Sequence, residues 1–286
     1  MAGVMHQEVM SMVMEVIRRT VRIVLLLLVA LFCLGPVLWQ TITSFKPETE
    51  LIRLPPVLPE APTGGHYEAV LTRSSLGRAL VNSATIAAST TALAIGFGAL
   101  CAFALARMPI KGKSVILGLI LTISMFPPIA VISSLYLLMR TLGLRDTVGA
   151  LILTHTTYAL PLAIWILTSF FRQIPVELYW AALVDGCSPL RALGSVILWP
   201  ALPGVTVAAL LVFIYSWNEF MFALTLTASD ASRTAPVAIA LFPGLHEVPW
   251  GDMAAASIVV TAPIVLLAIM FQRHIVAGLM AGSVKS

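Results

Sequence analysis

The polar residues that could do chemistry in this chain lie inside long apolar runs. His155 sits between threonines in one run, and Asn218 and Glu219 follow Tyr215 and Trp217 in another. An ionisable group at membrane depth is costly, so it is by default a functional hypothesis. Imidazole and carboxylate groups can exchange protons, whereas amide, hydroxyl and indole groups can hold a hydroxyl-rich solute. A third reading is structural, because such groups also form interhelical hydrogen bonds.

The sequence contains no complete motif of a known catalytic site. Gly112–Ser114 (GKS) matches the end of a phosphate-binding loop, but that pattern requires glycine where Arg107 stands and a strand before the loop. Neither H-E-x-x-H nor G-x-S-x-G occurs. The five histidines are scattered, and the three cysteines (Cys33, Cys101 and Cys187) fit neither a zinc site nor a disulfide framework. We therefore expect no catalytic residue, no metal and no cofactor bound by this chain, and a membrane enzyme ranks last.

Composition defines the chain as an integral membrane protein. Of its 286 residues, 59% are hydrophobic and 10% charged, whereas a soluble domain has roughly 45–50% apolar and about 25% charged residues. The net charge of +4 is explained by the positive-inside rule rather than by nucleic acid. The arginine-rich start precedes an apolar run too long for a signal peptide and without a small-x-small site, so we interpret it as a retained first span.

Six apolar runs are long enough to cross a bilayer, since a span needs about 20 mostly apolar residues. They cover residues 21–44, 79–106, 114–139, 147–171, 202–228 and 253–273. We predict an all-α membrane protein with a cytoplasmic segment 1–20, a six-span domain 21–273 and a cytoplasmic tail 274–286. Pro127-Pro128 and Pro161 remove backbone donors and predict kinks in spans three and four.

The distribution of Lys and Arg favours a cytoplasmic N-terminus and C-terminus. In this orientation ten basic residues lie inside and seven outside, and the inner loop 107–113 (RMPIKGK) is the clearest signal. At 1.5 Å per residue, His155, Glu219 and the face of span two that carries Asn82 and Ser89 then lie in the outer half. They could line a polar cavity, with Tyr215 or Trp217 stacked on a ring of the solute.

The same orientation makes residues 172–201 a cytoplasmic loop built from two short amphipathic helices. Glu177 suits the first turn of the first helix, and Gly186 can take the positive φ that ends it. Ser188 and Pro189 are typical of the N-cap and N1 positions of the second helix. An apolar stripe follows helical spacing: Val176, Trp180, Leu183 and Val184. Two interpretations are open, a hairpin that packs on lipid and a docking element for a cytosolic partner.

This loop resembles the EAA loop of the permeases of ABC importers. Ala181, Ala182, Asp185 and Gly186 match that family's pattern, and Pro203-Gly204 follows at the expected distance. Trp180 stands where the family usually has Glu, and Trp199 stands where it usually has Pro. Apolar packing by Trp180 is therefore the alternative to the family's glutamate contact.

Further segments resemble the carbohydrate branch of the same family, so the similarity covers nearly the whole chain. They are SFKPETE, NSATIA, MFPP, SWNEF, TAPVAIALF and the tail FQRHIVAGLMAGSVKS. The chain most resembles the second permease of maltose- and trehalose-type importers.

The resemblance implies a permease subunit that imports a di- or oligosaccharide across a bacterial cytoplasmic membrane. Its expected partners are a second permease, two ATPase subunits that hold ATP and Mg, an extracytoplasmic solute-binding protein and lipid, without nucleic acid. It also implies that the partner permease makes the main sugar contacts. The residues implied in docking the ATPase are Glu177, Trp180, Ala181, Ala182, Asp185 and Gly186.

A proton-coupled secondary sugar carrier is the runner-up, with Glu219 or His155 as its proton site. Such carriers usually show repeated halves and a site at the membrane midplane. Neither feature is detected in the sequence, and a carrier would not need the helical hairpin at residues 172–201.

Overall fold

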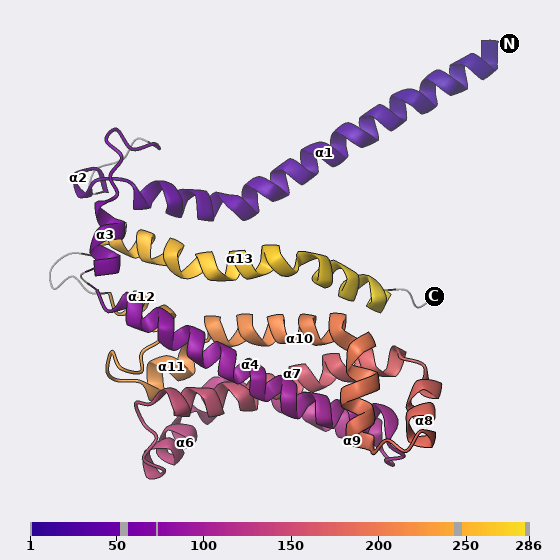
Figure 1. Ribbon diagram of the computed structural model, residues 1–286. Coiled ribbons are helices and arrows are strands. Elements are labelled where there is room, and N and C mark those ends of the chain that lie inside the picture. Colours follow the sequence, from indigo (N-terminus) through magenta and orange to yellow (C-terminus); the bar gives the residue numbers. More distant parts are fainter. Residues whose placement is uncertain (1, 52–56, 73, 243–247, 284–286) are drawn as a thin grey trace. The chain divides into compact units, whose positions relative to one another are not determined.

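The computed structural model describes residues 2–51, 57–72, 74–242 and 248–283, and every regular element in these ranges is helical (Figure 1). Five helices in this part of the chain are long and apolar enough to cross a membrane, and one bent helix pair would make a sixth. The predicted all-α class is therefore confirmed. The chain divides into two compact units, Met1–Val70 with Gly244–Ile258 and Leu71–Pro243 with Val259–Ser286.

The first unit is built around the long helix α1 (Ala2–Ser44). α1 includes the predicted span 21–44 and continues through residues 2–20, so the predicted boundary at residue 20 falls inside one helix. None of the most apolar window in Met14–Ser44 is buried among the residues that the structure describes. The short helices α2 (Glu48–Leu51) and α3 (Gly65–Thr72) follow.

A histidine joins the segment after α1 to the start of α13 (Trp250–Ser283). His66 Nε2 donates to the Lys46 carbonyl at 2.9 Å, and His66 Nδ1 lies 2.6 Å from Asp252 Oδ1. A Cβ at Gly251 would lie 2.3 Å from the imidazole, so only glycine admits the ring there. α13 also runs unbroken through residue 273 to Ser283, and residues 284–286 of the predicted tail lie outside the described residues.

The second unit has a core of three long helices, α4 (Leu76–Arg107), α7 (Val148–Gln173) and α10 (Leu198–Asn218). Small residues let these helices approach closely, as is common between membrane helices. Ala94 of α4, Ala159 and Ala163 of α7, and Val212 of α10 form one buried cluster. The predicted spans two and four correspond to α4 and α7.

The predicted third span is broken rather than kinked. α5 (Lys113–Ser124) and α6 (Pro128–Thr141) are bent by 83° across the break. Pro127 is extended, with φ −64° and ψ 125°, because Pro128 disfavours the helical conformation of the residue before it. α7, in contrast, continues as one helix through Pro161.

The predicted fifth span, 202–228, is wrong at both ends. Helical structure begins at Pro189, where α9 (Pro189–Ala192) passes through a π-helical turn, η1 (Leu193–Ile197), into α10. The π turn lies just before Pro200 and Pro203, whose missing N–H groups disturb regular α-helical bonding. α10 ends at Asn218, and the shorter helices α11 (Met221–Leu226) and α12 (Ala235–Ala240) follow.

Gly204 allows a close approach of α10 to Phe170 of α7. A Cβ at this position would lie 2.1 Å from the ring of Phe170. We predict that Gly204→Ala destabilises the protein by about 1–3 kcal/mol, the usual cost of overpacking. Thermal unfolding of the purified protein would measure it. Gly96→Ala is the matched control, because a Cβ there meets nothing within 4 Å. Equal midpoints for the two variants would contradict the close packing.

Candidate functional site

The loop after α7 forms a helical hairpin whose turn follows the sequence prediction. α8 (Val176–Val184) has Asp185 as its C-cap, and Gly186, which has φ +81°, turns the chain directly after it. The Cys187 N–H donates to the Ala182 carbonyl and the Gly186 N–H to the Leu183 carbonyl, which is the pattern of a Schellman cap. Ser188 is the N-cap of α9, since its Oγ accepts from the Arg191 N–H.

One side of α8 is locked to the ends of α4 and α7. Tyr179 and Ala182 are buried, and the Tyr179 ring meets Phe103 edge-on at 5.5 Å. Arg107, the last residue of α4, donates from Nη2 to the Phe171 carbonyl at 2.6 Å and also to the Ile174 carbonyl. A cation at a helix C-terminus is favourable, so Arg107 fixes the end of α7 from which α8 departs.

The other side of α8 is exposed and carries two adjacent rows at i, i+4 spacing. The rows are Val176, Trp180 and Val184, and Glu177, Ala181 and Asp185. Trp180 is 56% exposed and Val184 87%. Five of the six residues implied in docking therefore lie on an accessible surface, and the sixth, Ala182, packs inside the chain. We call these two rows with Gly186 the α8 surface.

Sequence reasoning missed Arg107 and Tyr179 as the residues that hold α8. Arg107 was recognised only as part of a basic loop, although a cation in the last turn of a helix is a known signal for capping. Tyr179 carries no local signal, because its partner Phe103 lies 76 residues earlier in the chain.

In the other half of the core, the structure brings His155 and Glu219 together. His155 is fully buried, with Nδ1 2.8 Å from Ser216 Oγ and Nε2 3.1 Å from Glu219 Oε2. The carboxylate of Glu219 also accepts from the Phe222 N–H at 2.9 Å and the Ala223 N–H at 3.0 Å. Glu219 thus satisfies the first free donors of α11 at the point where α10 has ended. Sequence reasoning missed Ser216, although it belongs to the SWNEF segment.

The remaining candidates from the sequence do not share one cavity face. Asn82 is buried and donates to the carbonyls of Ala231 and Arg233. Trp217 is buried, and its Nε1 donates to the Val260 carbonyl at 3.3 Å. The residues that keep accessible surface are Ser89, Tyr215 and Asn218.

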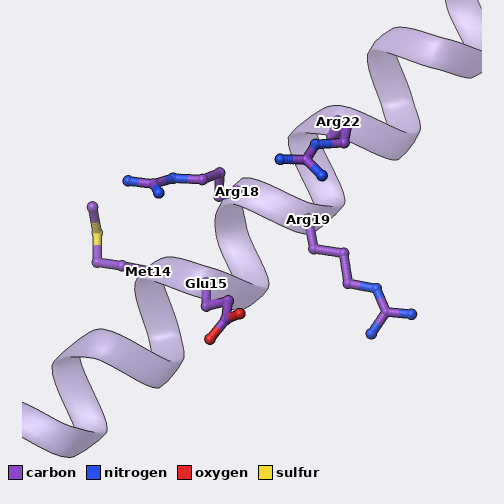
Figure 2. A pocket seen from close by; sticks show the side chains of 5 residues that line it. All are labelled: Met14, Glu15, Arg18, Arg19 and Arg22. Carbon is purple, nitrogen blue, oxygen red and sulfur yellow. The ribbon is translucent and has the colours of Figure 1, made fainter.

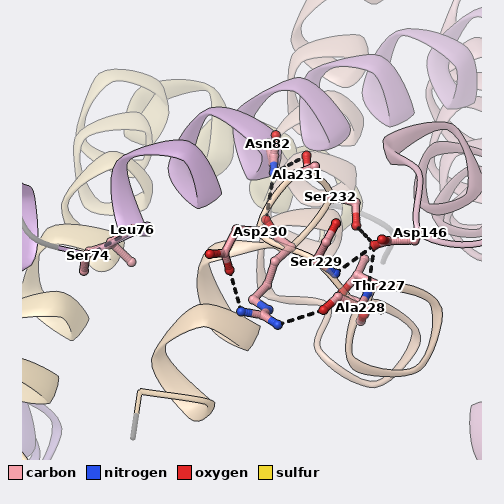
Figure 3. A network of polar contacts seen from close by, with 12 residues as sticks. Ser74, Leu76, Asn82, Asp146, Thr227, Ala228, Ser229, Asp230, Ala231 and Ser232 are labelled. Atoms are coloured by element: carbon pink, nitrogen blue, oxygen red, sulfur yellow. Dashed lines mark hydrogen bonds and ion pairs between the residues drawn. The ribbon is translucent and has the colours of Figure 1, made fainter.

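A polar network fixes the loop between α11 and α12 (Figure 3). Asp146, in the connection between α6 and α7, accepts from the N–H groups of Ala228 and Ser229 and from the Ser232 hydroxyl. The Asp146 backbone has φ +60°, a left-handed conformation that Asp tolerates better than most residues. With Asn82, these contacts hold an irregular segment in one conformation.

The hydrogen bonds around Asp146 control its ionisation. Burial alone would raise the pKa of the carboxyl, but the bonds from Ala228, Ser232 and Ser229 outweigh it and hold the pKa well below its usual range. The ionised form is therefore the one that fits this site.

The profile of the family of binding-protein-dependent transport system inner membrane components matches residues 94–280, and the chain belongs to this family. It is a multi-pass permease component of an ABC importer that works with a binding protein, and ATP binding lies with a partner ATPase rather than with this chain. Because the chain belongs to this family, the ABC importer hypothesis is correct and the secondary carrier hypothesis is rejected.

Two individual relatives within this family are sugar-transport permeases. The chain is 44% identical over 270 residues to the trehalose transport system permease protein SugB of Mycobacterium tuberculosis, covering 94% of this chain and 98% of the relative. It is 39% identical over 274 residues to the trehalose/maltose transport system permease protein MalG of Thermococcus litoralis, covering 95% and 98%.

A solved structure supports the fold. It is a bacterial ABC transporter involved in the import of the acidic polysaccharide alginate, and one chain of it matches with a TM-score of 0.78. The match covers 90% of this chain and 96% of that chain at 21% identity, which speaks for the architecture alone.

Removal of His155 should expose the dependence of α11 on its cap. His155→Ala removes the imidazole partner of the buried Glu219 carboxylate and leaves it only the N–H groups of Phe222 and Ala223, so we expect a loss of about 1–3 kcal/mol in unfolding free energy. The double variant His155→Ala/Glu219→Ala should lose less than the sum of the single variants. Denaturant unfolding would measure the cycle. Thr157→Ala is the control, because Thr157 is bonded to its own helix, and additive losses would rule out the coupling.

Asp146 should make stability depend on acid pH. Its contribution is complete above the unfolded pKa of about 3.9 and is lost as pH falls through the lower folded pKa. Asp146→Asn should lower stability at pH 7 by about 1 kcal/mol, since solvent partly screens this site, and should weaken the dependence below about pH 4. Thermal midpoints from pH 7 to 3 would test it. Asp230→Asn, a half-exposed control, should change little, and identical pH profiles for wild type and Asp146→Asn would refute the assignment.

Proposed function

We propose that this chain is one of two permease subunits that together translocate a di- or oligosaccharide of the trehalose or maltose type. The support is the pair of relatives at 44% and 39% identity, each matched over 98% of its own length, whose names specify trehalose and trehalose/maltose transport. A second candidate is a sulfoquinovosyl glycerol, because the permease SmoH of Agrobacterium fabrum is 39% identical over 253 residues. Both candidates are polyhydroxylated glycosides.

The α8 surface is the proposed docking element for one of two cytosolic ATPase subunits. It is exposed and contains a large aromatic side chain, Trp180, beside the acids Glu177 and Asp185. Aromatic anchors fill pockets at protein interfaces and contribute much of the binding energy. Trp180 is accordingly the proposed anchor, in the position where the family usually has glutamate.

The contacts behind α8 suit it for passing motion to the core. Tyr179 packs α8 against Phe103 of α4, and Arg107 of α4 donates to the end of α7 from which α8 departs. A shift of α8 would therefore act on both helices. α7 extends over about 39 Å at 1.5 Å per residue and holds α11 through His155 and Glu219. ATP can shift the inward–outward equilibrium only through the different affinities of the docked ATPase for the two states.

The proposed orientation places α8 and both termini in the cytoplasm. The contact between Phe103 and Tyr179 puts the basic loop after α4 at the same end of the core as α8. Lys111 and Lys113 belong to that loop, and short basic loops stay on the cytoplasmic side.

The proposed path residues on this chain are Ser89, Tyr215 and Asn218. All three keep accessible surface, and Tyr215 and Asn218 lie three residues apart on one face of α10. His155 and Glu219 act mainly to hold the helices that border this face. The second permease would supply the main sugar contacts.

The ATPase activity of the purified complex tests this proposal. In nanodiscs, binding protein loaded with trehalose or maltose should stimulate ATP hydrolysis at least several-fold, whereas loading with sulfoquinovosyl glycerol should not. Stimulation by the sulfonated glycoside alone would replace the proposed substrate class by the second candidate. No stimulation by any of them would reject both.

Gly186→Pro should abolish the stimulation in an assembled complex, because proline cannot adopt the φ of +81° found there. Gly186→Asn is the matched control, since Asn tolerates this conformation and should retain most of the stimulation. Full stimulation of the proline variant would rule out α8 as the coupling element.

A further inference from the structure

α1 is longer than a bilayer requires. Its 43 residues extend over about 64 Å at 1.5 Å per residue, whereas the hydrocarbon core is about 30 Å thick. The continuous apolar run starts at Ile23, so residues 2–22 prolong the same helix beyond it by about 30 Å. If the apolar run spans the hydrocarbon core, the turn that holds Arg18, Arg19 and Arg22 lies at the level of the lipid headgroups.

These three arginines lie on one face of the helix. Arg18 and Arg22 are four residues apart and Arg19 and Arg22 three apart, which makes them neighbours on the helix surface. They surround, with Met14 and Glu15, a depression of about 560 Å³ (Figure 2). Figure 2 shows the side chains of Arg18 and Arg22 extending in the same direction. All three arginines are exposed, and none forms an ion pair with the residues that the structure describes.

The chemistry of this surface selects an amphiphilic anion. A guanidinium group binds phosphate oxygens in a bidentate manner. Glu15 offsets one of the three positive charges and leaves an excess of two. The flanking side chains are apolar and about half exposed, namely Met10, Met14, Ile17 and Val21. A phosphate with acyl chains satisfies both features, whereas an acidic protein segment would leave the apolar flanks uncovered.

We propose that Arg18, Arg19 and Arg22 form a binding surface for the phosphate groups of anionic phospholipids. The assignment to the cytoplasmic leaflet rests on the proposed orientation, but the lipid contact itself does not. The consequence concerns the first span, whose most apolar window is not buried among the residues that the structure describes. Headgroup binding would set the depth of α1 in the bilayer.

Photo-crosslinking of the full transporter complex tests the proposal. The complex would be reconstituted in liposomes of phosphatidylcholine with 30% phosphatidylglycerol and a trace of photoactivatable phosphatidylglycerol, and the labelled residues mapped by mass spectrometry. We expect labels on residues 10–22 that compete with unlabelled phosphatidylglycerol and not with phosphatidylcholine. A basic side chain near an anionic surface contributes about 1 kcal/mol, or about fivefold in binding. R18Q/R19Q/R22Q should therefore lower this labelling at least tenfold.

Two further variants control for charge and topology. K111Q/K113Q removes two other basic residues and should leave the labelling of residues 10–22 unchanged. R18K/R19K/R22K keeps the charge that orients the first span and should lose twofold to fivefold, because an ammonium group cannot bind phosphate in a bidentate manner.

Four results would overturn the proposal. They are equal labelling of R18Q/R19Q/R22Q, an equal loss in K111Q/K113Q, full competition by 20 mM inorganic phosphate, and crosslinks from residues 10–22 to another subunit in place of lipid. Both leaflets of the liposome contain the anionic lipid, so an inverted orientation would not abolish the labelling. Accessibility of residues 10–14 to protease added outside sealed liposomes measures the orientation separately.

Discussion

Backbone hydrogen bonding at the ends of broken helices is the constraint on which this structure depends. In hydrocarbon, an unpaired N–H or carbonyl group costs several kcal/mol, so every interruption of a helix must be satisfied by the protein. The break between α10 and α11 shows how this is done. The carboxylate of Glu219 accepts two N–H groups of α11, and the buried imidazole of His155 supports that carboxylate from α7.

The same constraint explains the opposite end of α7. There the Phe171 and Ile174 carbonyls have no N–H partner within the helix. The guanidinium of Arg107 donates to both. α7 is thus tied at one end to α4 and α8 and at the other to α10 and α11. A single helix, α7, therefore connects the end from which α8 departs to α10 and α11. In the proposed function, the contacts that cap these helix ends also pass motion from α8 to the core.

These contacts concern backbone and helix ends rather than a particular solute. This agrees with the breadth of the fold, which a chain of an alginate importer shares at 21% identity. In the proposed function, substrate choice depends on accessible side chains such as Tyr215 and Asn218 and on the second permease. Residues that cap helices, such as Glu219 and Arg107, are expected to be needed whichever glycoside is carried.

Much of the architecture was determined by the sequence alone. Composition and the lengths of apolar runs decide the all-helical membrane class, because hydrocarbon admits few other structures. The turn at Gly186 and the cap at Ser188 were predicted because local backbone chemistry governs them. At Pro127-Pro128 a kink was predicted, and the structure has a full break between α5 and α6. The likeness of the α8 loop to the EAA loop identified the family, and the profile match confirmed it.

Only the tertiary structure decided which side of each helix meets a partner. The stripe that contains Trp180 is apolar, yet it faces outward, and Tyr179 and Ala182 take the buried side because Phe103 lies opposite. Three further features were likewise not predictable: the end of α10 at Asn218, the bond from Arg107 to the end of α7, and the hydrogen bonds that Asp146 accepts. Each depends on groups brought together from distant parts of the chain, and the spacing of residues along one helix contains no information about its neighbours.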